Sequence, residues 1–454
     1  MSGYIIAGAV VLLILVLLAT NKKLVETLKN IYKIEELRKR IVFTVGLLLV
    51  YRLGCFVVLP GIDANVISDG AALANQVGDN SLLGLLDVFS GGAFANAAVF
   101  ALGVMPYITA SIIIQLLGMM VPAIQKLQKE GESGRRKMNQ WTRLLTIGVL
   151  CIQGPAYVAN LYNQLPSNAF VFGATGTFYA YATVILIAGT MFTMWLGEKI
   201  TDKGIGNGIS MIIMIGIVAR LPQALTQELT RSIGADASGS IIAFVVELML
   251  LFLVFMATIA VVQAVRKIPV QYAKRIVGNK QYGGVRQYIP LKMNAANVMP
   301  IIFAQALMFI PGLFWPSFND IAGWPYNLTL AVMVILFTYF YTAIIINPQM
   351  MADDMKRNGG FIPGVKPGKA TVNFIDGVMT RITLPGSIFL ALVAILPGIA
   401  MVLGVGQQFA YFYGGTSLLI MVGVVLDTLK QVESYLLMRH YDGLMKTGRI
   451  QGRY

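Results

Sequence analysis

The stretch that most constrains this fold runs from Phe89 to Gln115, FSGGAFANAAVFALGVMPYITASIIIQ. It opens with a glycine pair and polar residues, and this opening part is too short and too polar to cross a membrane. From Ala97 onward the sequence predicts an apolar helix that carries Pro106. Interrupted apolar segments at membrane depth are tolerated only where they are buried in protein or line a cavity. A half-helix leading into a full helix therefore indicates a pathway through the molecule.

The composition is that of a polytopic membrane protein. Only 12% of the 454 residues are charged, 57% are hydrophobic, and the mean hydropathy is +0.72, whereas a soluble domain needs roughly a quarter of its residues charged. Cys55 and Cys151 lie in apolar runs and are expected to be small core residues. With these two cysteines and the single His440, we expect no disulfide framework, no metal site and no cofactor.

The N-terminal region contains an apolar run followed by an amphipathic segment. Residues 4–20 are close to the short limit for a spanning helix, and Lys22 and Lys23 follow directly. The positive-inside rule therefore places the N-terminus of this run outside. Residues 22–40 have apolar side chains at helical spacing between charges, which predicts an amphipathic helix on the cytoplasmic surface.

About ten further spanning helices are expected, and the basic residues set their orientation. The predicted spans are 41–60, 97–122, 142–165, 176–198, 207–226, 240–264, 294–315, 327–348, 382–403 and 413–437. One set of connecting loops is rich in Lys and Arg, whereas the alternate loops at 61–82, 166–176, 316–326 and 404–410 contain neither. Only Arg220 and Arg231 fall on the outer side. The basic loops and the C-terminus are therefore predicted to be cytoplasmic.

Two of the basic loops are longer than topology alone requires. Residues 266–293 alternate Val, Tyr and Ile with basic residues and turn at GNKQYGG, which predicts a hairpin reaching into the cytosol. Residues 352–372 contain KRNGGFIPGVKPGKA, where Gly and Pro punctuate the lysines. Both loops fit positive-inside topology alone. Both also fit the docking of an acidic protein or ribosomal RNA.

A series of motifs occurs in the order of a known family. They are FSGGAFANAAVFALGVMPYITASIIIQLL, KEGESGRRKMNQWTR, GTMFTMWLGEKITDKGIGNGIS, YAKR, IPLKMN, FYTAIIINP, FIPGVKPG and YGGTSLLI. Over residues 22–454 the chain resembles the SecY family, the channel subunits of the bacterial protein-export translocon. Residues 1–21, with the extra apolar run, lie outside this resemblance.

The resemblance implies an all-α polytopic fold of two pseudo-symmetric, inverted five-helix halves in the bacterial cytoplasmic membrane. The N-terminal half would comprise residues 22–232, with helices 1–5 and a re-entrant plug at 82–94. The C-terminal half would comprise residues 233–454, with helices 6–10 and the two cytosolic loops. The implied partners are the SecE and SecG subunits, the SecA motor ATPase, the ribosome, preprotein signal sequences and membrane lipid, with no DNA.

The resemblance also assigns site residues. The pore constriction maps to Val104, Ile108, Ile209, Ile213, Ile302 and Ile420. The plug contains Phe89, Ser90, Gly91 and Gly92, and the lateral gate lies around Thr109 and Asn294. The docking surface for the motor or ribosome maps to Lys274, Arg275, Arg357, Lys366 and Lys369. Lys366 stands where the family commonly has arginine, so a contact that needs the planar guanidinium fork is not carried over.

Physical chemistry is consistent with these roles but leaves alternatives open. An aliphatic ring repels water and ions by dewetting and offers a passing chain no fixed hydrogen bonds. Taken singly, each ring residue could equally face lipid or the core. Asn294 could cap its helix, and the plug could be a purely structural re-entrant loop. Ser90, Gly91 and Gly92 form a flexible unit that could move at little cost. Arg52, inside the first predicted span, has no assigned partner.

Two other function classes, a solute transporter and a membrane enzyme, fit the sequence less well than a channel does. A solute transporter usually keeps ionisable residues near the midplane, but the acidic residues here cluster in loops or at helix ends, with Glu247 and Asp427 as the closest exceptions. A membrane enzyme is disfavoured because the sequence contains no P-loop, GxSxG, HExxH or paired-carboxylate motif. Without a nucleotide site, energy would come from a partner or from the proton-motive force.

Overall fold

The computed structural model describes most of the chain. The described residues are 34–63, 87, 89–165, 169–171, 176–233, 241–272, 275–277, 280–282, 286–315, 318 and 320–447. The predicted apolar run at 4–20, the predicted amphipathic segment up to residue 33, residues 82–86 and 88 of the predicted plug, and Lys274 lie outside them.

Contacts divide the chain into two compact units. The first unit is Met1–Thr230 with Val424–Tyr454, and the second is Arg231–Gly423. The change of unit after Thr230 lies close to the expected division at 232, although the end of the chain groups with the first unit. The inverted-repeat relation between the two halves stays a prediction.

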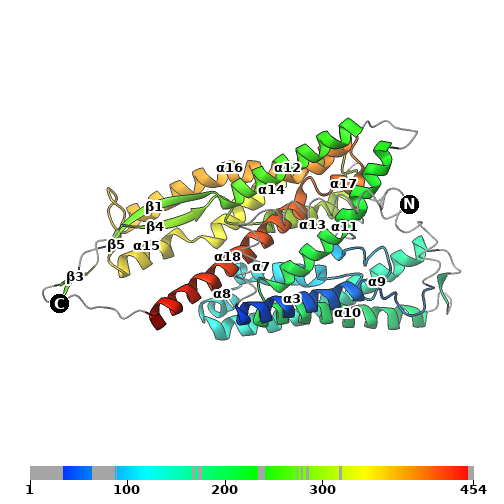
Figure 1. The fold of residues 1–454 in the computed structure, drawn as a ribbon, viewed down its shortest axis with the longest axis horizontal. Coiled ribbons are helices and arrows are strands. Elements are labelled where there is room, and N and C mark those ends of the chain that lie inside the picture. Colours follow the sequence, from blue (N-terminus) through cyan, green and yellow to red (C-terminus); the bar gives the residue numbers. More distant parts are fainter. Residues whose placement is uncertain are drawn as a thin grey trace. The chain divides into compact units, whose positions relative to one another are not determined.

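The first unit is built of helices (Figure 1). They are α3 (Glu35–Gly54), α7 (Met105–Met120), α8 (Pro122–Lys129), α9 (Glu132–Gln164), α10 (Gly176–Lys203), α11 (Gly208–Ile233) and the later part of α18 (Gly415–Thr447). Helix α7 packs on α9, α9 on α10, and α10 on α3. Residues 35–40, at the described end of the predicted amphipathic segment, continue into the first predicted span as one helix.

The helix predicted to begin at Ala97 begins later. Residues 91–104 form consecutive turns, and α7 starts at Met105 with Pro106 in its first turn. Proline is tolerated there because the first N–H groups of a helix have no partner within the helix. Ala97 and Gly103 have φ angles of 45° and 52°, which an α-helix cannot accommodate. The expected interrupted segment is therefore present, but its irregular part is longer than the sequence indicated.

An apolar core joins this irregular stretch to α9 and α10. Its buried members include Phe94, Ala97 and Ala101 from the irregular stretch, with Tyr157 on α9 and Leu186 on α10. Short antiparallel bridges pair Val58 with Ala98 and Ile62 with Phe170, so the chain after α3 crosses the same core in extended conformation.

The second unit combines helices with a small sheet. Its helices are α12 (Ile241–Gln263), α13 (Met299–Phe314), α14 (Trp324–Ile345), α15 (Pro348–Arg357), α16 (Lys369–Val402), α17 (Gln407–Ala410) and the start of α18. Its strands are β1 (Val265–Tyr272), β2 (Arg275–Val277), β3 (Lys280–Tyr282), β4 (Arg286–Lys292) and β5 (Gly360–Phe361).

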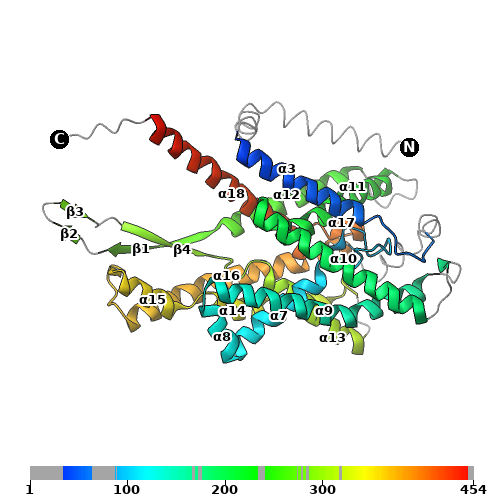
Figure 2. The same cartoon turned by 90° about the horizontal axis from the view of Figure 1, so that it is seen from below.

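The predicted hairpin at 266–293 is confirmed, and it packs with the second basic loop. Strands β1 and β4 pair antiparallel from Val265 opposite Lys292 to Gln271 opposite Arg286, with β2 and β3 pairing further along the hairpin (Figure 2). Strand β5 joins the other edge of β1. The sheet buries side chains against α15 and α16 in one core, made of Ile268, Val270, Leu291, Met355, Ile362, Ile375 and Met379. We call β1, β4, β5, α15 and the start of α16 the basic module.

Each of the ten predicted spans overlaps a helix. Within the described residues, seven helices are long and apolar enough to cross a membrane. Helices α7 and α13 have 16 residues each, fewer than the roughly 20 that a straight crossing needs. Cys55 is buried as expected, whereas Cys151 is exposed, so its predicted core position is wrong. An exposed thiol on an apolar helix is compatible with a lipid-facing surface.

We predict that packing inside the first unit, rather than apolar character alone, stabilises α10. Leu186 is fully buried, whereas Val184 on the same helix is 64% exposed. Leu186→Ala should lower the free energy of unfolding by about 2–5 kcal/mol, because it leaves a cavity. Val184→Ala should change it far less. Thermal unfolding of the purified protein in detergent would measure both. Equal losses would contradict the assignment of this core.

Candidate functional site

The irregular segment, residues 89–104, precedes α7 in the first unit and consists mainly of turns. Asp87, Phe89 and Ser90 are helical, and turns follow up to Val104. Gly91 and Gly92 have φ angles of 66° and 92°, the left-handed region that glycine adopts without strain. The first turn is closed by the Gly92 N–H, which donates to the Asp87 carbonyl at 3.0 Å.

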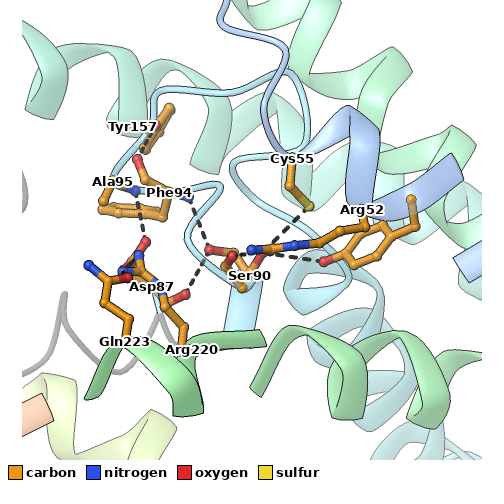
Figure 3. A network of polar contacts seen from close by, with 11 residues as sticks. Arg52, Cys55, Asp87, Ser90, Phe94, Ala95, Tyr157, Arg220 and Gln223 are labelled. Carbon is orange, nitrogen blue, oxygen red and sulfur yellow. Dashed lines mark hydrogen bonds and ion pairs between the residues drawn. The ribbon is translucent and has the colours of Figure 1, made fainter. Parts of the chain in front are cut away.

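Side chains from two helices donate hydrogen bonds to backbone carbonyls of these turns (Figure 3). On α3, the Tyr51 hydroxyl donates to the Ser90 carbonyl at 3.3 Å, and the Arg52 guanidinium donates to the Gly91 carbonyl at 2.5 Å. On α9, the Tyr157 hydroxyl donates to the Phe94 carbonyl at 2.9 Å. Backbone groups removed from water must find such partners. This network supplies the partner of Arg52 that the sequence did not reveal.

Asp87 holds the segment from within and also joins it to α11. Its Oδ1 accepts from the Ala95 N–H at 2.8 Å, and its Oδ2 forms an ion pair with Arg220. The Ser90 hydroxyl donates to the Asp87 carbonyl at 3.1 Å and accepts from the Phe94 N–H at 3.0 Å. Burial raises the pKa of the Asp87 carboxyl because desolvation disfavours the charge, and the attraction of Arg220 opposes this rise.

The two glycines allow direct contact between the segment and α11. A Cβ placed on Gly91 would lie 2.7 Å from the Gly216 Cα, and one on Gly92 would lie 2.9 Å from a guanidinium nitrogen of Arg220. A Cβ on Gly216 would in turn lie 3.0 Å from the Phe89 carbonyl oxygen. The glycine pair is therefore needed for close approach and for positive φ. The low cost of moving this unit, predicted from its glycines, stays a prediction; any such movement would have to break the contacts described above.

The segment ends at one predicted constriction residue, Val104, and contacts α11 close to another, Ile213. Val104 is the N-cap of α7, and the preceding Gly103 faces Ser90, since a Cβ on Gly103 would lie 3.8 Å from the Ser90 Cα. Gly216 follows Ile213 by three residues on α11, a rise of about 4.5 Å. Val104 and Ile213 are 5% and 8% exposed.

The other predicted constriction residues are distributed over both units. Ile108 on α7 and Ile209 on α11 belong to the first unit and are partly buried. Ile302 on α13 and Ile420 on α18 belong to the second unit. The ring as a whole stays a prediction.

The two predicted gate residues also lie in different units. The Thr109 hydroxyl donates to the Met105 carbonyl one turn earlier on α7, at 3.1 Å. Asn294 is buried ahead of α13, whose N-cap is Val298, so the alternative that Asn294 caps this helix is wrong. Its Oδ1 is buried with no hydrogen-bond partner among the described residues.

The predicted docking residues that the structure describes belong to the hairpin and the basic module. Arg275 is in β2, and Arg357 is in the last turn of α15. Arg357, Lys366 and Lys369 are exposed. The Lys366 carbonyl accepts from the Thr371 hydroxyl at 3.0 Å, which ties the loop to the start of α16.

Sequence reasoning missed Asp87, Arg220 and Tyr157. A signal for the first two was present, since Asp87 interrupts the apolar run LLGLLDVF and Arg220 interrupts an apolar helix. Opposite charges within a membrane protein usually face the interior and pair. The role of Tyr157 could not have been predicted, because the sequence does not show which backbone carbonyl a tyrosine hydroxyl contacts.

Comparison with known proteins places the chain in a family. The family model described as SecY matches residues 98–429. The chain is 40% identical to the protein translocase subunit SecY of Chlamydia trachomatis over 457 residues, covering 94% of this chain and 99% of the relative. It is 43% identical to the protein translocase subunit SecY of Thermus thermophilus over 439 residues, covering 93% and 98%.

Solved structures agree on the fold. One described as a protein conducting channel matches with a TM-score of 0.56 and 18% identity, covering 87% of this chain and 92% of that chain. An idle yeast Ssh1 complex bound to the yeast 80S ribosome matches with a TM-score of 0.54 and 14% identity, covering 92% and 94%.

A third solved structure concerns the plug of a SecY protein. It is described as showing that the plug domain of SecY stabilises the closed state and maintains a membrane seal, and it matches with a TM-score of 0.54 and 17% identity, covering 87% and 92%. The two relatives named above are translocase subunits, and the chain matches almost their whole length. The solute-transporter alternative is therefore set aside. The chain belongs to the SecY family, the polytopic membrane channels through which protein translocases move polypeptides.

Proposed function

We propose that the chain forms the channel of a translocase in the bacterial cytoplasmic membrane, with residues 82–94 as the plug. The observation that carries this proposal is the position of the irregular segment. Its glycines lie against α11 one helical turn from Ile213, and its Ser90 lies beside the residue that precedes Val104. In the predicted topology α11 runs outward, and the chain runs inward through α7. Both contacts are therefore on the outer side of the constriction residues, where a plug closes a pore.

The proposed constriction seals by being apolar. Val104, Ile108, Ile209, Ile213, Ile302 and Ile420 would form the ring. An aliphatic neck is dewetted when empty and slides along any side chain without binding it. Thr109 and Asn294 would lie at a seam that opens sideways and releases hydrophobic segments into lipid. Polar residues at such seams contribute only about 0.6–2 kcal/mol each, so a bound apolar helix can displace them.

The basic module is proposed as the cytosolic docking surface. Strand β1 buries Ile268 and Val270, while its Arg266 and Lys267 are exposed, so packing directs the basic side chains outward. Arg357, Lys366 and Lys369 add exposed charge on the neighbouring elements. The proposed partners are the SecA motor ATPase and the ribosome, with SecE and SecG as further subunits. The ribosome-bound Ssh1 complex, which shares the fold, supports the ribosome as a partner.

The seal can be tested with a polar substitution in the constriction. Ile213→Asn or Ile420→Asn should increase ion leak through translocase vesicles, or relax selectivity for signal sequences, because an amide hydrates the neck. Val218→Asn, at a 38% exposed position on α11, is the matched control and should leave both unchanged. Unchanged conductance and unchanged selectivity in a folded Ile213→Asn protein would count against the proposed pore.

Docking can be tested by charge reversal. Arg357→Glu or Arg275→Glu should weaken binding of the motor ATPase or the ribosome to membranes at low ionic strength. The loss should shrink as salt is raised, since the screening length is about 10 Å at 0.1 M. Lys39→Glu changes the net charge equally at an exposed site on α3, outside the basic module. Binding that is unaffected at every salt concentration, or is lost equally in Lys39→Glu, would sink this assignment.

A further inference from the structure

We infer that the Asp87–Arg220 ion pair, with the Arg52 hydrogen bond to the Gly91 carbonyl, is a latch that sets how readily the plug opens. It would thereby set how strong a signal sequence must be to open the channel. The inference rests on the proposed function, because it takes this segment to be the plug.

The segment is held in two physically different ways. From Phe94 onward it belongs to the apolar core, which includes Phe94, Ala97 and Ala101 and is joined by the Tyr157 hydrogen bond. The earlier part, Asp87 with residues 89–92, is held mainly by polar contacts to α3 and by glycine contacts to α11. Movement is therefore expected in the earlier part, with the core as the fixed end.

The largely buried ion pair is among the contacts that such a movement must break. The Arg220 and Asp87 side chains are 16% and 10% exposed. Charges in such surroundings attract each other far more strongly than in water. If one partner of a buried pair is removed, the other is left as an uncompensated buried charge, which is strongly unfavourable.

Asp87 also couples the shape of the segment to its attachment. One carboxylate oxygen accepts from the Ala95 N–H, and the other meets Arg220. The turn and its anchor therefore share one side chain. Pulling the segment from α11 would separate Asp87 from Arg220, so the carboxylate that organises the turn would lose its cation.

Each arginine also contacts a residue three or four positions further along the chain. The Arg220 guanidinium donates to Gln223 Oε1 at 3.4 Å on the same face of α11 and lies against Gly92. The Arg52 guanidinium lies 4.8 Å from the centroid of the Phe56 ring. Arg220 on α11 thus binds the Asp87 carboxylate, and Arg52 on α3 binds the Gly91 carbonyl. This part of the segment is therefore held by electrostatic contacts rather than by apolar packing.

The test compares Asp87→Asn, Arg220→Gln and the double variant in the assembled translocase. The asparagine keeps an oxygen for the Ala95 N–H but loses the charge. Two quantities are measured: resting ion leak in vesicles, and export of a precursor with a weakened signal sequence. Each single variant should raise both by at least about tenfold, because a buried charge loses its partner. The double variant should show less than the product of the single effects, because two neutral amides leave no orphan charge.

Two further variants keep the outcome decisive. Tyr157→Phe removes a hydrogen bond on the fixed side of the same segment, so it should change neither leak nor selectivity. If it matches Asp87→Asn, the contacts are merely structural and the latch is wrong. If Asp87→Asn does not accumulate, Arg220→Lys keeps the charge but loses the planar fork. It should then give a smaller rise in the same direction, and no rise would overturn the inference.

Ile213→Asn, measured alongside, separates this inference from the proposed function. If Ile213→Asn raises the leak and the Asp87 and Arg220 variants do not, the latch fails and the pore stands. If none of them alters leak or selectivity, the proposed function fails first.

Discussion

The structure of the first unit depends on one requirement: irregular backbone inside a membrane protein must have its polar groups satisfied. Residues 91–104 form turns where a helix would have met this requirement by itself. Tyr51, Arg52 and Tyr157 therefore donate to the carbonyls of the segment, and Asp87 accepts from one of its N–H groups. Helices α3 and α9 are tied to the segment through these bonds.

Helix α11 contacts the same segment through two of its residues, Gly216 and Arg220. Gly216 and Arg220 are four residues apart and so lie on one face of the helix, one turn from each other. The glycine lets the backbone of the segment approach closely, and the arginine meets its carboxylate. Close packing and charge pairing occur at the same place, and both lie one to two turns beyond Ile213. In the proposed function, the Asp87–Arg220 pair and the Arg52 hydrogen bond to the Gly91 carbonyl would also set how firmly the pore is closed.

Much of the fold could be predicted from sequence because it follows from local patterns. Apolar runs located the helices, and alternation between β-branched and basic residues located the hairpin of β1 and β4. Features that depend on tertiary contacts were missed. The late start of α7 reflects positive φ angles at Ala97 and Gly103, which apolar composition does not report. Cys151 looked like a core residue because an apolar run does not show which face of a helix meets lipid.

The candidate site was predictable in part. Family motifs located the glycine pair, but the reason for the pair differs, since close approach to Gly216 and positive φ require it. The partner of Arg52 is a backbone carbonyl, which no sequence pattern marks. The Asp87–Arg220 pair joins residues 133 positions apart, and one sequence offers no means of pairing two charges at that separation.

The most direct test of the central claim is site-specific crosslinking from positions 213 and 302 to a stalled, signal-bearing preprotein in membranes. A photoreactive residue would replace Ile213 or Ile302, with the same residue at the exposed Val218 as control. The account predicts crosslinks from both positions that follow successive residues of the substrate, and none from position 218. Silence from both positions, in a folded protein with the motor present, would contradict it and would mean that the polypeptide takes another path.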